Sequence, residues 1–200
     1  MSSPSPEEHA GVVVIAGLGN PGPEYVASRH NAGFWFVDAV AEHYRGVFRT
    51  ERKFHGATCR VDLDGRAVRL LKPSTYMNRS GLAVVSLACY YRVPPEQILV
   101  VHDDLDFPAG TVRLKHGGGT GGHNGLADLT RALGSDRYRR LRIGIGRTDG
   151  RARGIDYVLG TPSRSDCEAI DQAIEQALEA LPLIVAGEWD RAMQRLHGTP

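Results

Sequence analysis

Three polar stretches of the chain, two of them rich in glycine, each follow a segment whose apolar pattern predicts a β-strand. They cover residues 17–31, 72–80 and 101–125. In α/β proteins, functional side chains gather where the carboxyl ends of neighbouring strands meet. We therefore expect the chemistry of this chain to reside on these three stretches.

The first stretch offers a candidate general base. His30 lies close in sequence to Asn20, Tyr25 and Asn31, a set of groups that can donate, accept and titrate near neutral pH. The alternative is a partly buried histidine that caps the helix expected to follow. Among the other histidines, His102 and His123 are the rivals that remain.

An acidic group follows the strand that ends at His102. Asp103 is placed to hold an imidazole in one tautomer and to stabilise its protonated form. Two alternatives stay open, because Asp103, Asp104 and Asp106 would also suit a solvated acidic turn or a magnesium site.

Two groups of glycines point to possible ligand-binding segments. Gly17, Gly19 and Gly22 satisfy the G-x-G-x-x-G pattern of dinucleotide-binding proteins, but no helix pattern resumes directly after them, which disfavours an NAD-dependent oxidoreductase. Residues 116–125 hold six glycines in ten positions, which favours a loop whose backbone approaches a ligand closely, with a flexible linker as the alternative. Asn124 stands at the predicted start of the next helix, where it would contact a ligand or cap the helix.

The elements that must position these groups alternate between strand and helix patterns. Strands are expected at residues 12–16, 98–102, 111–115 and 141–145, and residues 57–63 and 66–72 predict a hairpin joined by a type I′ turn at Asp64-Gly65. Helices are expected from residue 31, at residues 79–92 and 123–133, from Thr161-Pro162 with Thr161 as cap and a break or kink at Pro182, and around residues 189–196. The fold class is therefore α/β, a single domain with a central, mixed, mostly parallel twisted sheet and helices on both faces.

Composition places the chain among globular proteins of one domain. It has 200 residues, of which 42% are hydrophobic, and its 24 basic and 23 acidic side chains leave a formal charge of +1. Residues 1–10 have the composition of a disordered tail, and residues 11–200 form the predicted domain. We expect a cytoplasmic protein that does not enter a membrane, because no apolar run is long enough to span one and the start is polar and acidic.

Charge is distributed unevenly despite the small total. Eight arginines lie within residues 131–153, and Arg113 and Lys115 lie on the strand leading into the glycine loop. This pattern suits a surface that follows nucleic-acid phosphates, although a solvated arginine-rich face is the common alternative.

Five motifs taken together resemble the bacterial peptidyl-tRNA hydrolase family. They are GLGNPGPEY with SRHNAGF, KPSTYMNRSG, VVHDDLD, GGGTGGHNGL and RLRIGIGR, in the family's order and spacing over about residues 12–197. The resemblance implies an ester hydrolase that releases tRNA and peptide from peptidyl-tRNA that has left the ribosome. It also implies a monomer that needs no metal, no cofactor and no obligate protein partner.

The resemblance also implies roles for individual residues. His30 is similar to the general base of the family, Asp103 to the carboxylate that supports it, and Asn20 to the residue that separates blocked from unblocked aminoacyl-tRNA. Positions that resemble contacts to the peptide and the 3′ terminal nucleotide are Tyr25, Tyr76, Asn78 and Asn124. Arg113 and Lys115 are the expected contacts to stem phosphates. The alternative function is a non-catalytic RNA-binding homologue on the same fold.

Overall fold

A computed structural model describes residues 11–146 and 154–198 of the chain, so the predicted tail at residues 1–10 lies outside the described residues. Within them, seven strands form one sheet in the order β2-β3-β4-β1-β5-β7-β6. The strands are β1 Val14–Gly17, β2 Arg49–Glu51, β3 Gly56–Leu63, β4 Arg66–Pro73, β5 Ile98–Asp104, β6 Val112–His116 and β7 Arg139–Gly144. The α-helices are α1 Ala32–His43, α2 Ser80–Tyr91, α3 Asn124–Leu133, α4 Gly154–Leu159, α5 Arg164–Ala186 and α6 Trp189–His197.

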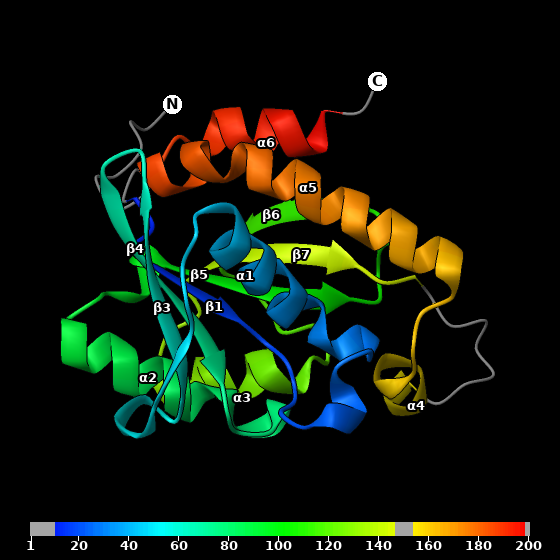
Figure 1. The fold of residues 1–200 in the computed structure, drawn as a ribbon, viewed down its shortest axis with the longest axis horizontal. Helices are drawn as coiled ribbons and strands as arrows, with labels where there is room; N and C mark the ends of the chain where they lie inside the picture. The colour runs from blue at the N-terminus through cyan, green and yellow to red at the C-terminus, as the bar shows by residue number, and fades with distance from the viewer. Residues whose placement is uncertain (1–10, 147–153, 199–200) are drawn as a thin grey trace.

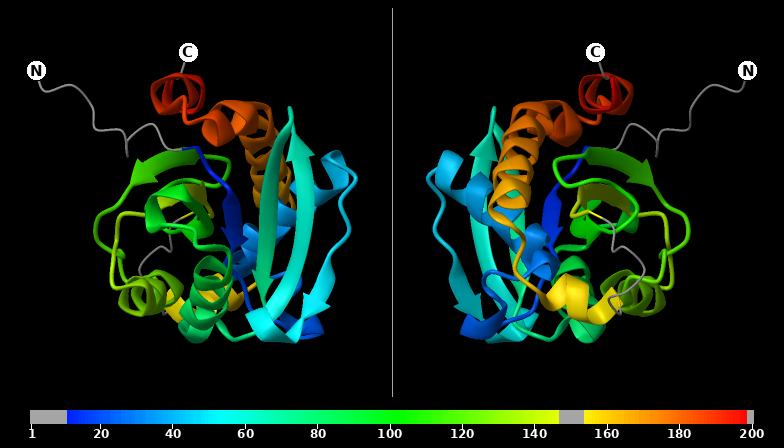
Figure 2. Two further views of the ribbon diagram at one scale, coloured as in Figure 1. Left: turned by 90° about the vertical axis from the view of Figure 1, so that its left-hand side faces the viewer. Right: turned by 90° about the vertical axis from the view of Figure 1, so that its right-hand side faces the viewer.

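Helices cover both faces of the sheet, as predicted (Figure 1). Buried side chains of α1, α5 and α6 pack on one face, and those of α2 and α3 pack on the other. Two further views show the long β3–β4 hairpin at one side of the molecule and β6 and β7 at the other (Figure 2). The mixed α/β sheet of the sequence prediction is confirmed.

Parallel pairing is confined to the centre of the sheet. The order β4-β1-β5-β7 is parallel throughout, whereas β2-β3, β3-β4 and β6-β7 are antiparallel. Three of the six pairs are therefore parallel, fewer than the predicted majority, because both edges are built from antiparallel pairs. The β3–β4 hairpin itself is confirmed, and Asp64 and Gly65 have φ values of 52° and 80°, as a type I′ turn requires.

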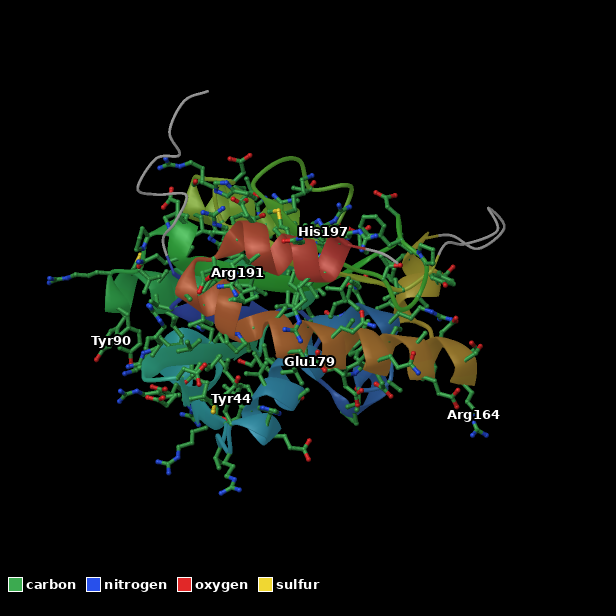
Figure 3. The ribbon with its side chains drawn as sticks, turned by 90° about the horizontal axis from the view of Figure 1, so that it is seen from above. Tyr44, Tyr90, Arg164, Glu179, Arg191 and His197 are labelled. Atoms are coloured by element: carbon green, nitrogen blue, oxygen red, sulfur yellow. The ribbon has the colours of Figure 1, made fainter. Side chains whose placement is uncertain are left out.

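The long C-terminal helix differs from its prediction at two points. It begins at Arg164, because Ser163, not Thr161, is the cap: its Oγ accepts a hydrogen bond from the Asp166 N–H at 3.1 Å. Of the break or kink expected at Pro182, the break does not occur, because Pro182 lies inside α5, which continues to Ala186. Fully buried residues flank this proline, among them Leu181 and Ile184, and their packing compensates for the backbone hydrogen bond that proline cannot donate. Seen from above, α5 and α6 lie together across the sheet (Figure 3).

Three short 3-10 turns complete the framework of the cleft described below. They are η1 Pro23–Tyr25, η2 Arg29–Asn31 and η4 Met77–Arg79, and they follow β1 and β4. No helix in the described part of the chain is long and apolar enough to span a membrane.

Candidate active site

The three stretches singled out in the sequence meet at one edge of the sheet. Because β4, β1 and β5 are adjacent and parallel, their carboxyl ends lie side by side, and a cleft of about 770 Å³ opens there. The predicted site residues that line this cleft are Asn20, His30, Tyr76, Asn78, Asp103, Lys115 and Asn124. Tyr25 and Arg113 are not among its lining residues.

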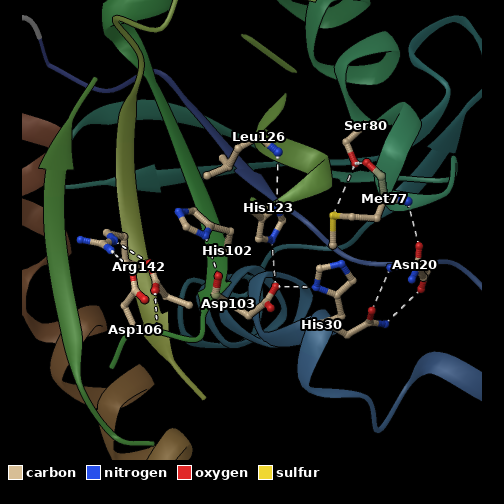
Figure 4. Close-up of polar contacts among 12 residues, drawn as sticks. Asn20, His30, Met77, Ser80, His102, Asp103, Asp106, His123, Leu126 and Arg142 are labelled. Carbon is tan, nitrogen blue, oxygen red and sulfur yellow. Dashed lines mark hydrogen bonds and ion pairs between the residues drawn. The ribbon is translucent and has the colours of Figure 1, made fainter. Parts of the chain in front are cut away.

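Asp103 binds two imidazoles with one carboxylate oxygen. Its Oδ1 is 2.8 Å from Nδ1 of His30 and 3.0 Å from Nε2 of His123 (Figure 4). The Asp103 side chain is 2% exposed. Burial alone would raise the pKa of Asp103, but the adjacent His123 and His30 lower it well below its usual range by charge and by hydrogen bonding. Asp103 is therefore ionised and can only accept.

This acceptor fixes the tautomers of both rings. With Asp103 ionised, Nδ1 of His30 and Nε2 of His123 must each carry a proton. His123 supports this independently, because its Nδ1 accepts a hydrogen bond from the Leu126 N–H at 3.3 Å and so caps α3. The neutral His30 ring then keeps a lone pair on Nε2, the arrangement that a general base requires.

His123 was left in the sequence as a rival base, and the structure instead pairs it with the same carboxylate. It also takes the capping position that Asn124 was considered for, and Asn124 is exposed on the cleft. The His123-Asn124 pair at the end of the glycine run is the signal that could have found this role. It was missed because histidine is an uncommon helix cap, so the capping role was considered for the asparagine.

Asn20 is held by three hydrogen bonds that leave one group for a ligand. Its N–H donates to Oδ1 of Asn31 at 2.8 Å, and its carbonyl oxygen accepts from Nδ2 of Asn31 at 3.0 Å. Its own Oδ1 accepts from the Met77 N–H at 2.8 Å. Because the carbonyl end of the side chain is engaged, its amide NH₂ group remains as the donor available to the cleft. Asn31, mentioned in the sequence only as a neighbour, is thus a structural partner of Asn20.

Tyr76 lines the cleft, and Tyr25 packs against it from outside the lining residues. Tyr76 is 56% exposed, and its ring centroid is 6.3 Å from that of Tyr25, with the planes at 86°. Asn78 follows on η4 and is exposed. Such a group of accessible rings and an amide can stack on and hydrogen-bond an unpaired base.

The acidic run that begins in the last two residues of β5 is divided among separate partners. Asp104 Oδ2 accepts from Nε of Arg142 at 2.6 Å, while Asp103 faces the two histidines. Three carboxylates therefore do not converge as the magnesium alternative needs. Within the described ranges, the one group whose ligand atoms could hold a metal ion is His30, Asp103 and His123, all within 4.8 Å of one another. Their short hydrogen bonds already account for this grouping.

A buried arginine holds the glycine-rich loop. Arg140 is 2% exposed, and its Nη1 donates to the carbonyl oxygen of Gly119 at 2.7 Å, while Nη2 donates to that of Gly118. These two hydrogen bonds tie the glycine-rich loop to a side chain of β7.

Arg113 does not line the cleft and is bound to the end of α6. Its Nη1 donates to the carbonyl oxygen of Leu196 at 3.0 Å, at the end of α6, and the nearby His197 Nε2 accepts from the Leu114 N–H at 2.8 Å. Figure 3 shows His197 at the end of α6. Lys115, two residues further along β6, lines the cleft.

The glycines of the dinucleotide pattern serve protein packing. A Cβ on Gly17 would lie 2.2 Å from the carbonyl oxygen of Gly33, and one on Gly19 would lie 2.7 Å from the Phe34 ring. These glycines therefore let α1 approach β1 closely, which accounts for the pattern without a bound dinucleotide.

His102 supplies a pH-dependent prediction for stability. Burial and the neighbouring His123 lower its pKa to about 3 from 6.5, so the folded protein keeps this ring neutral at pH values where the unfolded chain protonates it. Stability should therefore fall as the pH drops below about 6.5, with one proton contributing up to about 1.4 kcal/mol per pH unit. Urea unfolding between pH 4 and 6 should show a flatter dependence in His102→Gln. The exposed His43→Gln serves as control, and equal slopes in all three proteins would contradict the assignment.

A histidine that lines a cleft and binds a buried carboxylate through one ring nitrogen is an arrangement that general-base hydrolases use. The sequence model of the family described as peptidyl-tRNA hydrolase matches residues 14–200. A peptidyl-tRNA hydrolase of Halorhodospira halophila is 50% identical over 184 residues, covering 92% of this chain and 95% of the relative.

Solved structures agree with the sequence relatives. The crystal structure of peptidyl-tRNA hydrolase from Acinetobacter baumannii has a TM-score of 0.89 and 45% identity, covering 92% of this chain and 94% of its own. A single-substitution variant of the Acinetobacter baumannii protein gives 0.90 and 45%, with coverages of 94% and 95%. The chain belongs to the peptidyl-tRNA hydrolase family, and its activity is that of an ester hydrolase acting on peptidyl-tRNA.

Proposed function

We propose that this chain cleaves the ester between a peptide, or an N-blocked amino acid, and the 3′ ribose of tRNA, with His30 as the general base. The observation that carries the proposal is the 2.8 Å contact between His30 Nδ1 and the buried, ionised Asp103 at the cleft. This pairing leaves Nε2 of His30 as the proton acceptor.

The reaction needs one water and no group beyond the cleft residues. Nε2 of His30 takes a proton from water as the water oxygen attacks the ester carbonyl carbon. The tetrahedral intermediate then collapses, the bond from carbon to the ribose oxygen breaks, and the proton passes from His30 to that leaving oxygen. Asp103 stabilises the transient imidazolium without accepting its proton.

Negative charge that develops on the carbonyl oxygen needs donors. The free NH₂ group of Asn20 is held rigidly by Asn31 and Met77, which suits a preorganised donor. Asn78 is the second amide on the cleft. We assign substrate contact to both, with Asn20 also reading the blocked amino group, as the family resemblance implies.

The 3′ end of tRNA would occupy the open mouth of the cleft. Tyr76 and Tyr25 offer ring faces and edges for the terminal base, and Asn124 offers a further amide that lines the cleft. Stacking tolerates any base, and phosphate contacts carry no sequence information, so this arrangement suits many tRNAs.

Lys115 gives the phosphate part of the proposal a direct test. If its ammonium contacts one stem phosphate, Lys115→Gln should weaken binding of deacylated tRNA and lower the slope of log K against log salt by about 0.9. Filter binding from 50 to 300 mM KCl measures this. Hydrolysis of a minimal 3′-terminal ester that lacks the tRNA body should stay unchanged.

Arg113→Gln, measured in parallel, tests the other predicted phosphate contact. Its guanidinium is bound to the Leu196 carbonyl, so loss of a phosphate contact must be separated from loosening of α6. A lowered salt slope at unchanged thermal stability supports the tRNA contact, and an unchanged slope counts against it.

The activity itself is tested by incubating the purified chain with N-acetyl-aminoacyl-tRNA and following free tRNA and released acid. Hydrolysis of the blocked ester with little hydrolysis of the unblocked one supports the proposal. Binding of tRNA without hydrolysis would favour the non-catalytic RNA-binding alternative. That the chain works as a monomer in the cytoplasm stays a prediction, which sedimentation and fractionation would test.

A further inference from the structure

A buried arginine lies directly before the proposed base and has no part in the mechanism above. Arg29 begins η2, the turn that also carries His30, and it is 9% exposed. Its guanidinium points away from Asp103 toward the segment of α4 and the start of α5. Arg29 therefore joins parts of the chain that are more than 120 residues apart.

Arg29 contacts α4 in three ways. Its guanidinium carbon lies 4.2 Å from the centroid of the Tyr157 ring, and its Nη1 donates to the Tyr157 carbonyl oxygen at 3.3 Å. Its backbone N–H donates to the carbonyl oxygen of Gly160 at 3.1 Å, just past the end of α4. A cation at the carboxyl end of a helix also interacts favourably with the free carbonyls there.

The other contacts of this arginine are weak. Asp166 Oδ2 is 3.8 Å from Nη2, beyond hydrogen-bond distance, and Nε has no hydrogen-bond partner among the described residues. A buried guanidinium with an unpaired nitrogen costs stability compared with an apolar side chain of similar length. Filling space is therefore not a sufficient reason for an arginine at this position.

The helix that Arg29 holds is one wall of the cleft. Ile155, Val158 and Leu159 of α4 line it, and they give this wall an apolar character. The second anchor of α4 is the Tyr157 hydroxyl, which donates to the carbonyl oxygen of Ile145 at 3.0 Å. The wall is thus fixed to η2 on one side and to the segment after β7 on the other.

We propose that Arg29 is a positioning residue that sets the distance between the α4 wall and His30, and thereby the binding of the acyl part of the substrate. The inference rests on the proposed function. An apolar wall suits apolar acyl side chains, so the effect of Arg29 should depend on the side chain next to the ester. Because Arg29 touches neither Asp103 nor the cleft, the chemical step itself should change little.

The test uses Arg29→Met, which keeps the length of the stem and removes the guanidinium. With N-acetyl-leucyl-tRNA, KM should rise about 10-fold while kcat stays within about 3-fold of the parent chain. With N-acetyl-glycyl-tRNA, which offers the wall no side chain, KM should rise less than about 3-fold. Arg29→Lys retains a buried cation but not the planar stack, so its KM should lie between those of the parent chain and Arg29→Met.

Two further variants separate positioning from folding. Asp166→Asn removes only the distant carboxylate and should match the parent in KM. Tyr157→Leu removes both the ring that Arg29 stacks on and the hydroxyl that binds the Ile145 carbonyl, so it should raise KM at least as much as Arg29→Met. In the Tyr157→Leu background, Arg29→Met should add little to the KM, because its stacking partner is already gone. Tyr157→Leu alone tests the proposal if Arg29→Met does not fold.

Three results would overturn the inference. They are an unchanged KM in Arg29→Met, an equal KM increase for the leucyl and glycyl substrates, and a loss of kcat at constant KM. A parent chain that hydrolyses neither substrate would instead refute the proposed function, so the two failures are distinguishable.

Discussion

Replacing His30 by alanine should lower kcat on N-acetyl-aminoacyl-tRNA by about 10²-fold to 10⁴-fold, the range expected when a general base is lost. The Kd for deacylated tRNA should stay close to that of the parent chain, because Nε2 of His30 acts on water and not on the phosphates. Single-turnover hydrolysis and filter binding on the same preparations measure the two quantities.

His123→Ala provides the matched comparison, since it removes the other imidazole bound to the same oxygen. Its effect should be smaller, because His123 caps α3 and its Nε2 donates to Asp103 instead of facing water. A His30→Ala variant with near-normal turnover would refute the assignment of the base. A larger loss in His123→Ala than in His30→Ala would transfer the role to His123.

Replacing Asp103 by asparagine should also lower kcat strongly, by about 10²-fold or more, because a neutral amide can present an N–H to His30 and favour the wrong tautomer. The carboxylate stabilises the imidazolium form, since its own pKa lies well below its usual range. Removing that charge favours the neutral ring, so the acidic limb of the pH–rate profile should move to lower pH. A profile of kcat/KM from pH 5 to pH 9 measures both effects.

Asp104→Asn is the control on the adjacent residue. Asp104 pairs with Arg142 and contacts neither imidazole, so its replacement should leave the position of the acidic limb unchanged. An Asp103→Asn variant whose limb moves to higher pH would contradict the proposed charge relation.

Much of the fold was predictable because local patterns and packing agree in it. The run of β-branched residues at β1 suits a strand buried on both faces, and Asp64-Gly65 specifies the β3–β4 turn without help from the rest of the chain. The three residues of β2 and the six of α4 were missed, since such short elements carry no measurable period. A break at Pro182 was one of the two expected outcomes and does not occur, because burial of the residues around the proline cannot be seen from the proline alone.

The site was predictable in its residues but not in its connections. Polar groups after predicted strands pointed to His30 and Asp103, yet they are 73 residues apart, and the second ring on Asp103 comes from a further segment. Which carboxylate faces which partner depends on side-chain direction at the end of β5, where Asp103 and Asp104 point to different neighbours. Arg113 binds the end of α6 and Lys115 lines the cleft. This difference depends on where the edge strand β6 lies in the sheet, which the sequence does not show.

Because two imidazoles share one carboxylate oxygen, the net charge of this group changes during the proposed reaction. The proposed reaction starts from neutral imidazoles, and in that state the buried trio of His30, Asp103 and His123 carries one negative charge, on Asp103. In the proposed reaction, uptake of the water proton by His30 brings the net charge of the trio to zero, and the negative charge forms on the substrate, near the amides of Asn20 and Asn78. The proposed step therefore neutralises the buried negative charge of the trio at the moment when the negative charge forms on the substrate. When His30 passes its proton to the ribose oxygen, the trio regains its negative charge for the next turnover.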